Sequence, residues 1–185
     1  MRRRTRQAAV LAALALSAGM MGCAEQALKI EGGEEALPAD DGSPGFLDRV
    51  SSQKAVTEND AFRGLLMLLD GDDPAKSFQQ RAEKLAERGI VARRWTHGAG
   101  RTLTKGKLAY MVCQACEVPG GVVLTLTGPS QRYCLRELQY RRMMSVGTPL
   151  APVTGLEFVA VLTRADTYRR TGEFPRIMET ASGGQ

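Results

Sequence analysis

Apolar residues recur at helical spacing in three segments of the chain, and each segment follows an aliphatic residue and a threonine. The three threonines are Thr57, Thr104 and Thr154, and apolar residues stand four, seven, eight and eleven positions after each of them. This is the spacing of one buried helical face. A threonine hydroxyl at a helix start can accept a hydrogen bond from an otherwise unpaired backbone N–H. The pattern therefore predicts three helices, each capped by its threonine.

Two further segments carry helical periodicity ahead of the second and third threonines. They span residues 78–91 and 133–144, and each ends in a basic residue followed by an aliphatic residue or a methionine. The pattern thus predicts a repeated unit of helix, loop and threonine-capped helix. Successive threonines are 47 and 50 residues apart. Residues 122–127 are rich in β-branched side chains between glycine and proline, which predicts one short extended segment or hairpin near 121–127. The expected fold is mainly α, a helical repeat domain with this one extended interruption.

The first 23 residues have the order of an export signal. Four arginines stand in residues 1–7, an uncharged and mostly apolar run fills residues 8–21, and Gly22 and Cys23 follow. The run is shorter than the roughly 20 apolar residues of a bilayer-spanning helix, so we expect it to be removed on export. The ending resembles the lipobox of bacterial lipoproteins. That resemblance implies a lipid on Cys23; ordinary cleavage nearby is the alternative, and export is common to both.

Most of the net positive charge of the chain lies in this export signal. The chain has 25 Lys and Arg against 20 Asp and Glu, and four of the arginines fall within residues 1–7. Removal of the signal leaves a nearly neutral protein, so nucleic acid is not an expected partner. Residues 23–52 are acidic, contain Gly and Pro, and lack a sustained apolar period, which predicts a disordered linker. The expected organisation is a signal peptide (1–22), this linker, a helical domain (53–168) and a C-terminal tail (169–185).

The repeated unit resembles the S-layer homology module, in which a helix with a Gly-Ile or Gly-Val end leads through a loop to a threonine-capped helix. The matching residues are Arg88-Gly89-Ile90-Val91, Trp95 in the loop and the sequence LTKGKL from Leu103, with VTGLEF from Val153 as a second copy. The likeness covers about 110 residues, from Val56 to Asp166, as two units and one preceding half.

The resemblance implies three modules packed with pseudo-threefold symmetry, which bind acidic cell-wall polysaccharide in the grooves between them. In the family a motif arginine contributes to that contact, and the equivalent positions here hold Lys105, Gly155 and Glu58. The basic loop around Trp95 could contact an anionic glycan or a partner protein; the alternative is that it holds solvated arginines and a tryptophan that covers the core. The candidate contact residues are Arg93, Arg94, Trp95, Arg101 and Lys105.

The three cysteines after the export signal are better suited to a structural role than to redox chemistry. Cys113 and Cys116 form a C-x-x-C motif late in a predicted helix, whereas a reactive thiolate is usually stabilised at a helix start. Zinc would need a fourth ligand beside these two and Cys134, and His97 is the only histidine, so no metal site is predicted. In an oxidising compartment Cys134 could form a disulfide with one of the pair; three buried thiols are the alternative.

The sequence contains no recognisable catalytic constellation, because His97 stands in a glycine-rich loop without an implied nucleophile. We therefore expect a protein that is not an enzyme and needs no cofactor. The predicted function is an exported, lipid-anchored binding or scaffold module of the cell envelope, attached to a membrane by its N-terminal lipid. The alternatives are an envelope thiol-redox protein that uses Cys113 and Cys116, and a helical adaptor for another envelope protein.

Overall fold

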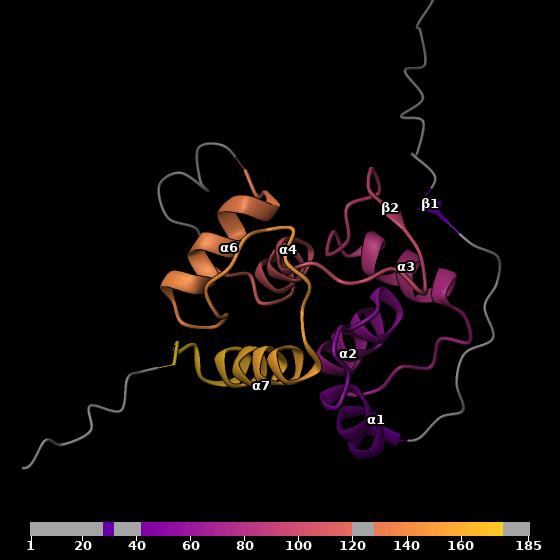
Figure 1. Cartoon of the computed structure of the whole chain (residues 1–185), viewed down its shortest axis with the longest axis horizontal. Coiled ribbons are helices and arrows are strands. Elements are labelled where there is room, and N and C mark those ends of the chain that lie inside the picture. Colours follow the sequence, from indigo (N-terminus) through magenta and orange to yellow (C-terminus); the bar gives the residue numbers. More distant parts are fainter. Residues whose placement is uncertain (1–27, 32–41, 120–127, 176–185) are drawn as a thin grey trace, which may run out of the picture.

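The computed structural model describes residues 28–31, 42–119 and 128–175. Within these residues the fold is mainly α, as the sequence predicts (Figure 1). The predicted signal peptide and extended segment near 121–127 lie outside the described residues. The helices are α1 (Gly42–Ser51), α2 (Glu58–Asp70), α3 (Phe78–Glu87), α4 (Lys105–Ala115), α6 (Gln131–Tyr140) and α7 (Gly155–Thr171), and the strands are β1 (Lys29–Ile30) and β2 (Thr96–His97).

Thr57, Thr104 and Thr154 cap α2, α4 and α7, as the sequence predicts. In each helix the threonine hydroxyl accepts the backbone N–H three residues further on, at 3.2, 3.4 and 3.3 Å respectively. A cap of this kind stabilises a helix by about 1 kcal/mol. The starts of these three helices are therefore encoded in their local sequence.

The residues just before the three threonines form a closed ring of backbone hydrogen bonds. The N–H of Val56 donates to the carbonyl of Val153 at 2.9 Å, and the N–H of Val153 donates to Leu103 at 3.1 Å. The N–H of Leu103 completes the ring by donating to Val56 at 2.8 Å. All three side chains are fully buried. Because each segment donates once and accepts once, the three capped helices start from one point in the core and stand in cyclic order.

Each capped helix is covered by a shorter helix. α3 packs on α2, α6 packs on α4, and α1 packs on α7. The six described helices thus form three pairs (Figure 1). In each pair the shorter helix is the one that precedes the next capped helix in cyclic order: α3 precedes α4, α6 precedes α7 and α1 precedes α2. The backbone ring joins the three capped helices in a cycle as well.

The two helices α3 and α6 end in the same way. The N–H of Ile90 and the N–H of Met143 each donate to the carbonyl five residues earlier, at 2.9 and 2.8 Å. This is the bond of a Schellman motif, which requires a left-handed residue at the helix end. The residue that adopts it is Gly89 in one helix, with a φ of 70°, and Arg142 in the other, with a φ of 59°. Residues that the sequence pattern aligned therefore make equivalent backbone contacts.

Helix α1 lies in the segment predicted to be a disordered linker, and that prediction is wrong for residues 42–51. Phe46 and Val50 of α1 are fully buried. The end of α1 also lies close to the start of α7, because a Cβ atom added to Gly155 would come within 1.8 Å of the Val50 carbonyl oxygen. The folded domain therefore begins before residue 53.

Two further short segments outside residues 53–168 pack against the domain. β1 pairs in parallel with β2, and Ile30 stands opposite His97 in the register. At the other end, α7 continues to Thr171, and the rings of Tyr168 and Phe174 stack with 4.3 Å between their centroids. The predicted linker and tail thus both contribute residues to the folded body.

Candidate functional site

Charged side chains are buried where the capped helices begin. The first residue of one capped helix there forms an ion pair with the third residue of the next one. Glu58 of α2 pairs in this way with Lys107 of α4. Lys105 of α4 pairs with Glu157 of α7, with 2.9 Å between Nζ and the carboxylate. We call the contact between the starts of two capped helices a joint. These two joints use the same two helix positions, with the charges exchanged.

The third joint, between α7 and α2, is built differently. Its first helical residue is Gly155, which carries no side chain, and α1 lies over that position. The Asp60 carboxylate of α2 is therefore bound from the α1 side, by Arg49 at 3.3 Å and by Gln53 at 2.9 Å. Helix α1 thus supplies the charge partner that the first residue of α7 lacks.

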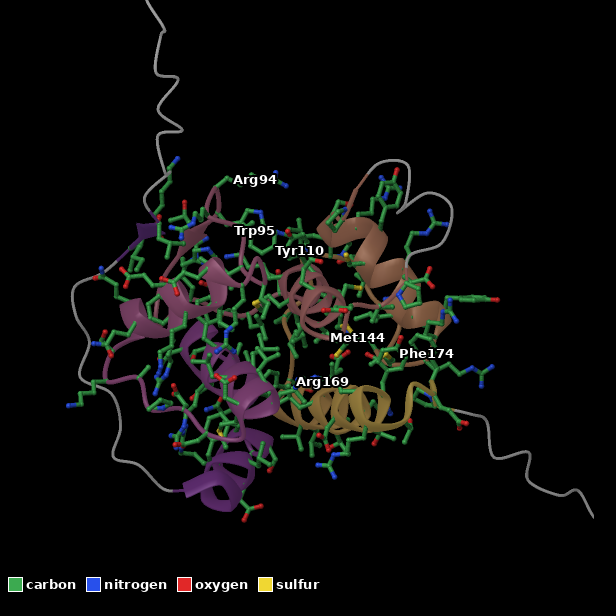
Figure 2. The ribbon with its side chains drawn as sticks, turned by 180° about the vertical axis from the view of Figure 1, so that it is seen from behind. Arg94, Trp95, Tyr110, Met144, Arg169 and Phe174 are labelled. Carbon is green, nitrogen blue, oxygen red and sulfur yellow. The ribbon has the colours of Figure 1, made fainter. Side chains whose placement is uncertain are left out.

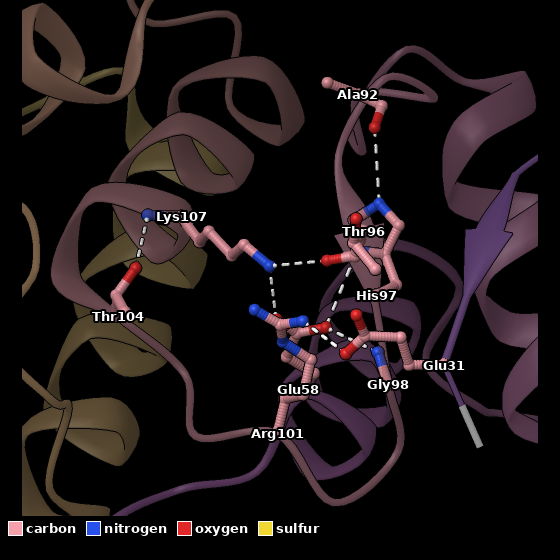
Figure 3. A network of polar contacts seen from close by, with 9 residues as sticks. All are labelled: Glu31, Glu58, Ala92, Thr96, His97, Gly98, Arg101, Thr104 and Lys107. Atoms are coloured by element: carbon pink, nitrogen blue, oxygen red, sulfur yellow. Dashed lines mark hydrogen bonds and ion pairs between the residues drawn. The ribbon is translucent and has the colours of Figure 1, made fainter.

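Glu58 is the centre of the most buried of these networks (Figure 3). Its side chain is 1 % exposed, and one carboxylate oxygen binds the ammonium group of Lys107. The other oxygen accepts the backbone N–H of Gly98 at 3.0 Å. Lys107 also donates to the carbonyl of Thr96 at 3.1 Å. This network joins the start of α2 to α4 and to the loop that contains β2.

The ring of His97 also lies beside the Glu58 carboxylate. Its buried ring has Nδ1 3.6 Å from Glu58 and Nε2 3.2 Å from the carbonyl of Ala92. Burial raises the pKa of the Glu58 carboxyl, but the neighbouring His97 ring, the hydrogen bond and charge of Lys107 and the Gly98 N–H together lower it below the ordinary value of 4.5. Glu58 is therefore ionised at neutral pH, and the joint is held by charge as well as by hydrogen bonds.

Lys105, one of the predicted ligand contacts, is buried. Its Nζ donates to the Ser145 hydroxyl at 2.6 Å and pairs with Glu157, and the residue is 7 % exposed. Gly147 closes the space around it, because a Cβ atom there would lie 3.0 Å from the Lys105 side chain. The prediction that Lys105 presents its charge to a ligand is therefore wrong, since that charge is neutralised inside the protein.

The other predicted contact residues belong to the loop between α3 and α4. Arg94 is exposed and Arg93 is half-buried. Trp95 is also half-buried, and its ring meets that of Tyr110 edge-on with 4.8 Å between centroids. Figure 2 shows Arg94 at the periphery of the molecule and Trp95 further in, beside Tyr110. The tryptophan therefore has a structural contact and is still partly exposed.

Arg101 at the end of this loop is joined to the segment that contains β1. Its side chain is 45 % exposed, and its guanidinium group donates to the Glu31 carboxylate at 2.5 Å (Figure 3). The backbone N–H of Glu31 in turn donates to the carbonyl of His97 at 2.6 Å. The basic loop, defined as residues 92–101, is thus fastened to the N-terminal strand by one side-chain contact and by backbone pairing.

Sequence reasoning missed Glu58 and Lys107 as a buried pair. The information was present in the aligned segments, because Glu58 stands one position after its threonine and Lys107 three positions after its own. Lys105 and Glu157 occupy the same two offsets with the charges exchanged. Opposite charges at the first and third positions of successive capped helices were the signal that could have revealed both joints.

The three described cysteines are buried free thiols. Cys113 lies in the last turn of α4 and Cys116 is its C-cap residue, as the sequence predicts. A hydrogen bond to the Cys134 thiol and burial both raise the pKa of Cys113, and burial raises that of Cys116 to about 11. The two thiols of the C-x-x-C motif are therefore protonated at neutral pH and poorly nucleophilic, which disfavours a redox role.

No cluster of three His, Cys, Asp or Glu side chains in the described part of the chain is placed to hold a metal ion. Within residues 28–31, 42–119 and 128–175, none of the helices is both long enough and apolar enough to cross a bilayer. Cys23, the predicted lipidation site, lies outside these ranges.

The buried charges of the joints are used within the protein, whereas the basic loop keeps guanidinium groups at the surface. These features are the basis for a functional proposal, because no family model, curated protein or solved structure matches the chain.

Proposed function

We propose that the protein is an exported, non-enzymatic binding or scaffold module of the cell envelope, built from three units of the S-layer homology type. The observation that carries this proposal is the backbone ring that links Val56, Leu103 and Val153 in cyclic order. The packing of α1, α3 and α6 on the capped helices in the same order supports it. In this interpretation α1 is the first helix of the first unit. The sequence pattern indicated only the second, threonine-capped helix of that unit.

The proposed contact surface is the basic loop. Arg94 is exposed there, Arg93 and Trp95 are partly exposed, and Arg101 keeps 45 % of its side chain accessible beside Glu31. Guanidinium groups form paired hydrogen bonds with carboxylates and phosphates, which makes them suited to an anionic polymer. The partly exposed Trp95 adds an apolar surface against which a sugar ring can pack. The loop therefore offers the chemistry that an acidic glycan requires.

The proposed attachment is a lipid on Cys23, which would hold the module on a membrane while the basic loop contacts its ligand. A single lipid chain binds a membrane only marginally, and stable attachment takes two chains or a second signal. The diacylglyceryl group implied by the lipobox resemblance provides two chains. Mass spectrometry of the protein recovered from membranes tests this step directly, through the mass of the peptide that begins at Cys23.

Binding to an immobilised polyuronate, alginate, tests the proposed contact surface. The full chain, purified in mild detergent, is expected to bind at low ionic strength and to be released as salt screens the charges. Arg94→Glu should weaken binding by about tenfold, because one charge-assisted contact is lost and a repulsive charge is added.

The matched control is Arg136→Glu, which makes the same charge change at an exposed position of α6. It should bind alginate as the unchanged protein does, and both variants should keep the helical circular-dichroism spectrum. Absence of binding at low salt would overturn the proposal. Equal losses for both variants would show that only net charge matters and would remove the basic loop as the site.

An adaptor that docks on another envelope protein is the second candidate. Three large apolar side chains, two in the segment that leads into α7 and one in its first turn, favour it, because Val146, Leu150 and Leu156 are 90 %, 82 % and 72 % exposed. Exposed aliphatic side chains of this kind are typical of protein contacts when they gather on one surface. Affinity purification from native membranes identifies such a partner.

A further inference from the structure

Three buried sulfur atoms have no role in the proposed binding function. Cys113 and Cys116 belong to the end of α4, and Cys134 lies in α6, which packs on α4. All three are less than one-tenth exposed. Their surroundings differ, and the difference selects one pair.

Cys113 and Cys134 face each other across the contact between α4 and α6. The Cys113 thiol lies 3.9 Å from the backbone carbonyl oxygen of Cys134 and donates toward it. The two thiols also interact directly, since a hydrogen bond from Cys113 lowers the pKa of Cys134 and favours the thiolate of that residue. The Cys113 thiol therefore lies against Cys134 at the contact between α4 and α6.

Cys116 faces a different helix. Its thiol donates toward the carbonyl of Ala165 in α7 at 3.9 Å. It stands at the C-cap of α4, past the turn that carries Cys113. Although the C-x-x-C spacing suggests that Cys113 and Cys116 belong together, the fold directs the two thiols to different neighbours.

We propose that Cys113 and Cys134 are joined by a disulfide when the chain meets a disulfide oxidant, and that Cys116 remains a free thiol. The bond links α4 to α6 and closes the chain between them. By restricting the unfolded chain, such a bond stabilises the folded state. It would hold α6 on α4, within one helix pair, by a covalent link in addition to apolar packing.

The oxidant we specify is a small or protein-borne disulfide, such as oxidised glutathione. The thiolate of Cys134 attacks one sulfur of that disulfide, forms a mixed disulfide and releases one thiolate. Cys113 then loses its proton and attacks the Cys134 sulfur, and the second thiolate of the oxidant leaves. The two cysteines lose two protons and two electrons in total, and the oxidant takes up both as its two leaving thiolates become thiols. Because both cysteines are buried, the exchange takes place before α6 has closed on α4.

The test is refolding of the full-length Cys23→Ser chain in oxidised and reduced glutathione, followed by alkylation in denaturant and peptide mapping. The Cys23→Ser background leaves only the three thiols in question. The expected product is a cross-linked peptide that contains Cys113 and Cys134, with Cys116 alkylated. The oxidised chain should also unfold at a higher urea concentration than the reduced one.

Cys116→Ala is the matched control and should leave the cross-link in place. Cys134→Ala should abolish both the cross-link and the difference between oxidised and reduced chains in urea. The proposal fails if the map shows a bond through Cys116, or if all three thiols are alkylated after oxidation. Because the peptide map does not require a functional ligand, its failure is distinct from failure of alginate binding.

Discussion

Glu58 illustrates how a single buried charge is tolerated in this protein. Its carboxylate has lost nearly all contact with water, and a buried charge of this kind is costly unless it is paired and hydrogen-bonded. Here the Lys107 ammonium group and the Gly98 N–H bind it, and Nδ1 of His97 lies 3.6 Å away. Together these neighbours lower the pKa of Glu58 more than burial raises it. The residue is thus a charged bridge between two helix starts.

This arrangement predicts how stability depends on pH. Because the folded pKa of Glu58 lies below 4.5, its ordinary value, the contribution of the carboxylate is complete above that pH and is lost as the pH falls through the lower folded value. Glu58→Gln leaves Lys107 without its buried counter-charge and should cost about 3 kcal/mol at pH 7. Urea unfolding at pH 7 and at pH 3.5 measures the effect, and the gap between the two proteins should narrow at pH 3.5.

Glu87→Gln, at an exposed position of α3, is the control for this experiment. Its effect should stay small at both pH values, because an exposed carboxylate contributes little. A cost of Glu58→Gln that is the same at pH 7 and at pH 3.5 would contradict the role assigned to ionised Glu58.

Residues that act through near neighbours in the chain could be predicted from the sequence. Thr57, Thr104 and Thr154 reach an N–H only three residues away, so their capping role depends on local sequence alone. Lys105 could not be placed in the same way, because its partner Glu157 is brought to it by the packing of another helix. Its identity as a cation suggested a ligand contact, whereas the fold uses that charge internally.

At the scale of elements, α1 shows why a helix can escape sequence analysis. Its sequence, GSPGFLDRVS, contains glycine and proline and only three large apolar residues. A helix of 10 residues is marginal by itself, and most helical stability comes from packing. For α1 that packing is provided by α7, which begins more than one hundred residues later. β1 and β2 are two residues each, too short to produce an alternating pattern.

The packing of α1 can be tested at Phe46. Its ring is fully buried, and the guanidinium group of Arg63 lies 4.6 Å from its centroid. Phe46→Ala should lower the free energy of unfolding by about 3 kcal/mol, as expected for a buried aromatic side chain. Asp48→Ala, at an exposed position of the same helix, should change it by less than about 0.5 kcal/mol. Similar small effects for both variants in urea unfolding would mean that α1 is not part of the folded core.

At the scale of the whole molecule, the backbone ring makes the three helix pairs mutually dependent. Removing any one segment leaves an unpaired donor on one neighbour and an unpaired acceptor on the other, and unpaired buried backbone groups are costly. The charged joints lie on the same contacts and add to this coupling. The domain should therefore unfold as one unit, although its helices come from distant parts of the chain.

Trp95, the only tryptophan, provides a local probe of this cooperativity. It lies in the loop before α4, far along the chain from α1, so its fluorescence reports on a different helix pair. Unfolding in urea followed by Trp95 fluorescence and by helical circular dichroism should give one midpoint. Phe46→Ala should lower both midpoints equally. A fluorescence transition that Phe46→Ala leaves unchanged would show that the pairs unfold independently.

The pairing of β1 with β2 also limits how far the domain can move from its N-terminal attachment point. Cys23 is five residues from Leu28, where the described chain begins, and five fully extended residues span at most about 18 Å. A lipid on Cys23 would therefore keep the edge of the domain that carries β2 within that distance of the bilayer surface. Arg93 and Arg94 lie just before β2 in the chain, so the anchor would restrict the basic loop to ligands in the layer next to the membrane. A tether of the full predicted linker length would have allowed the domain to search much farther.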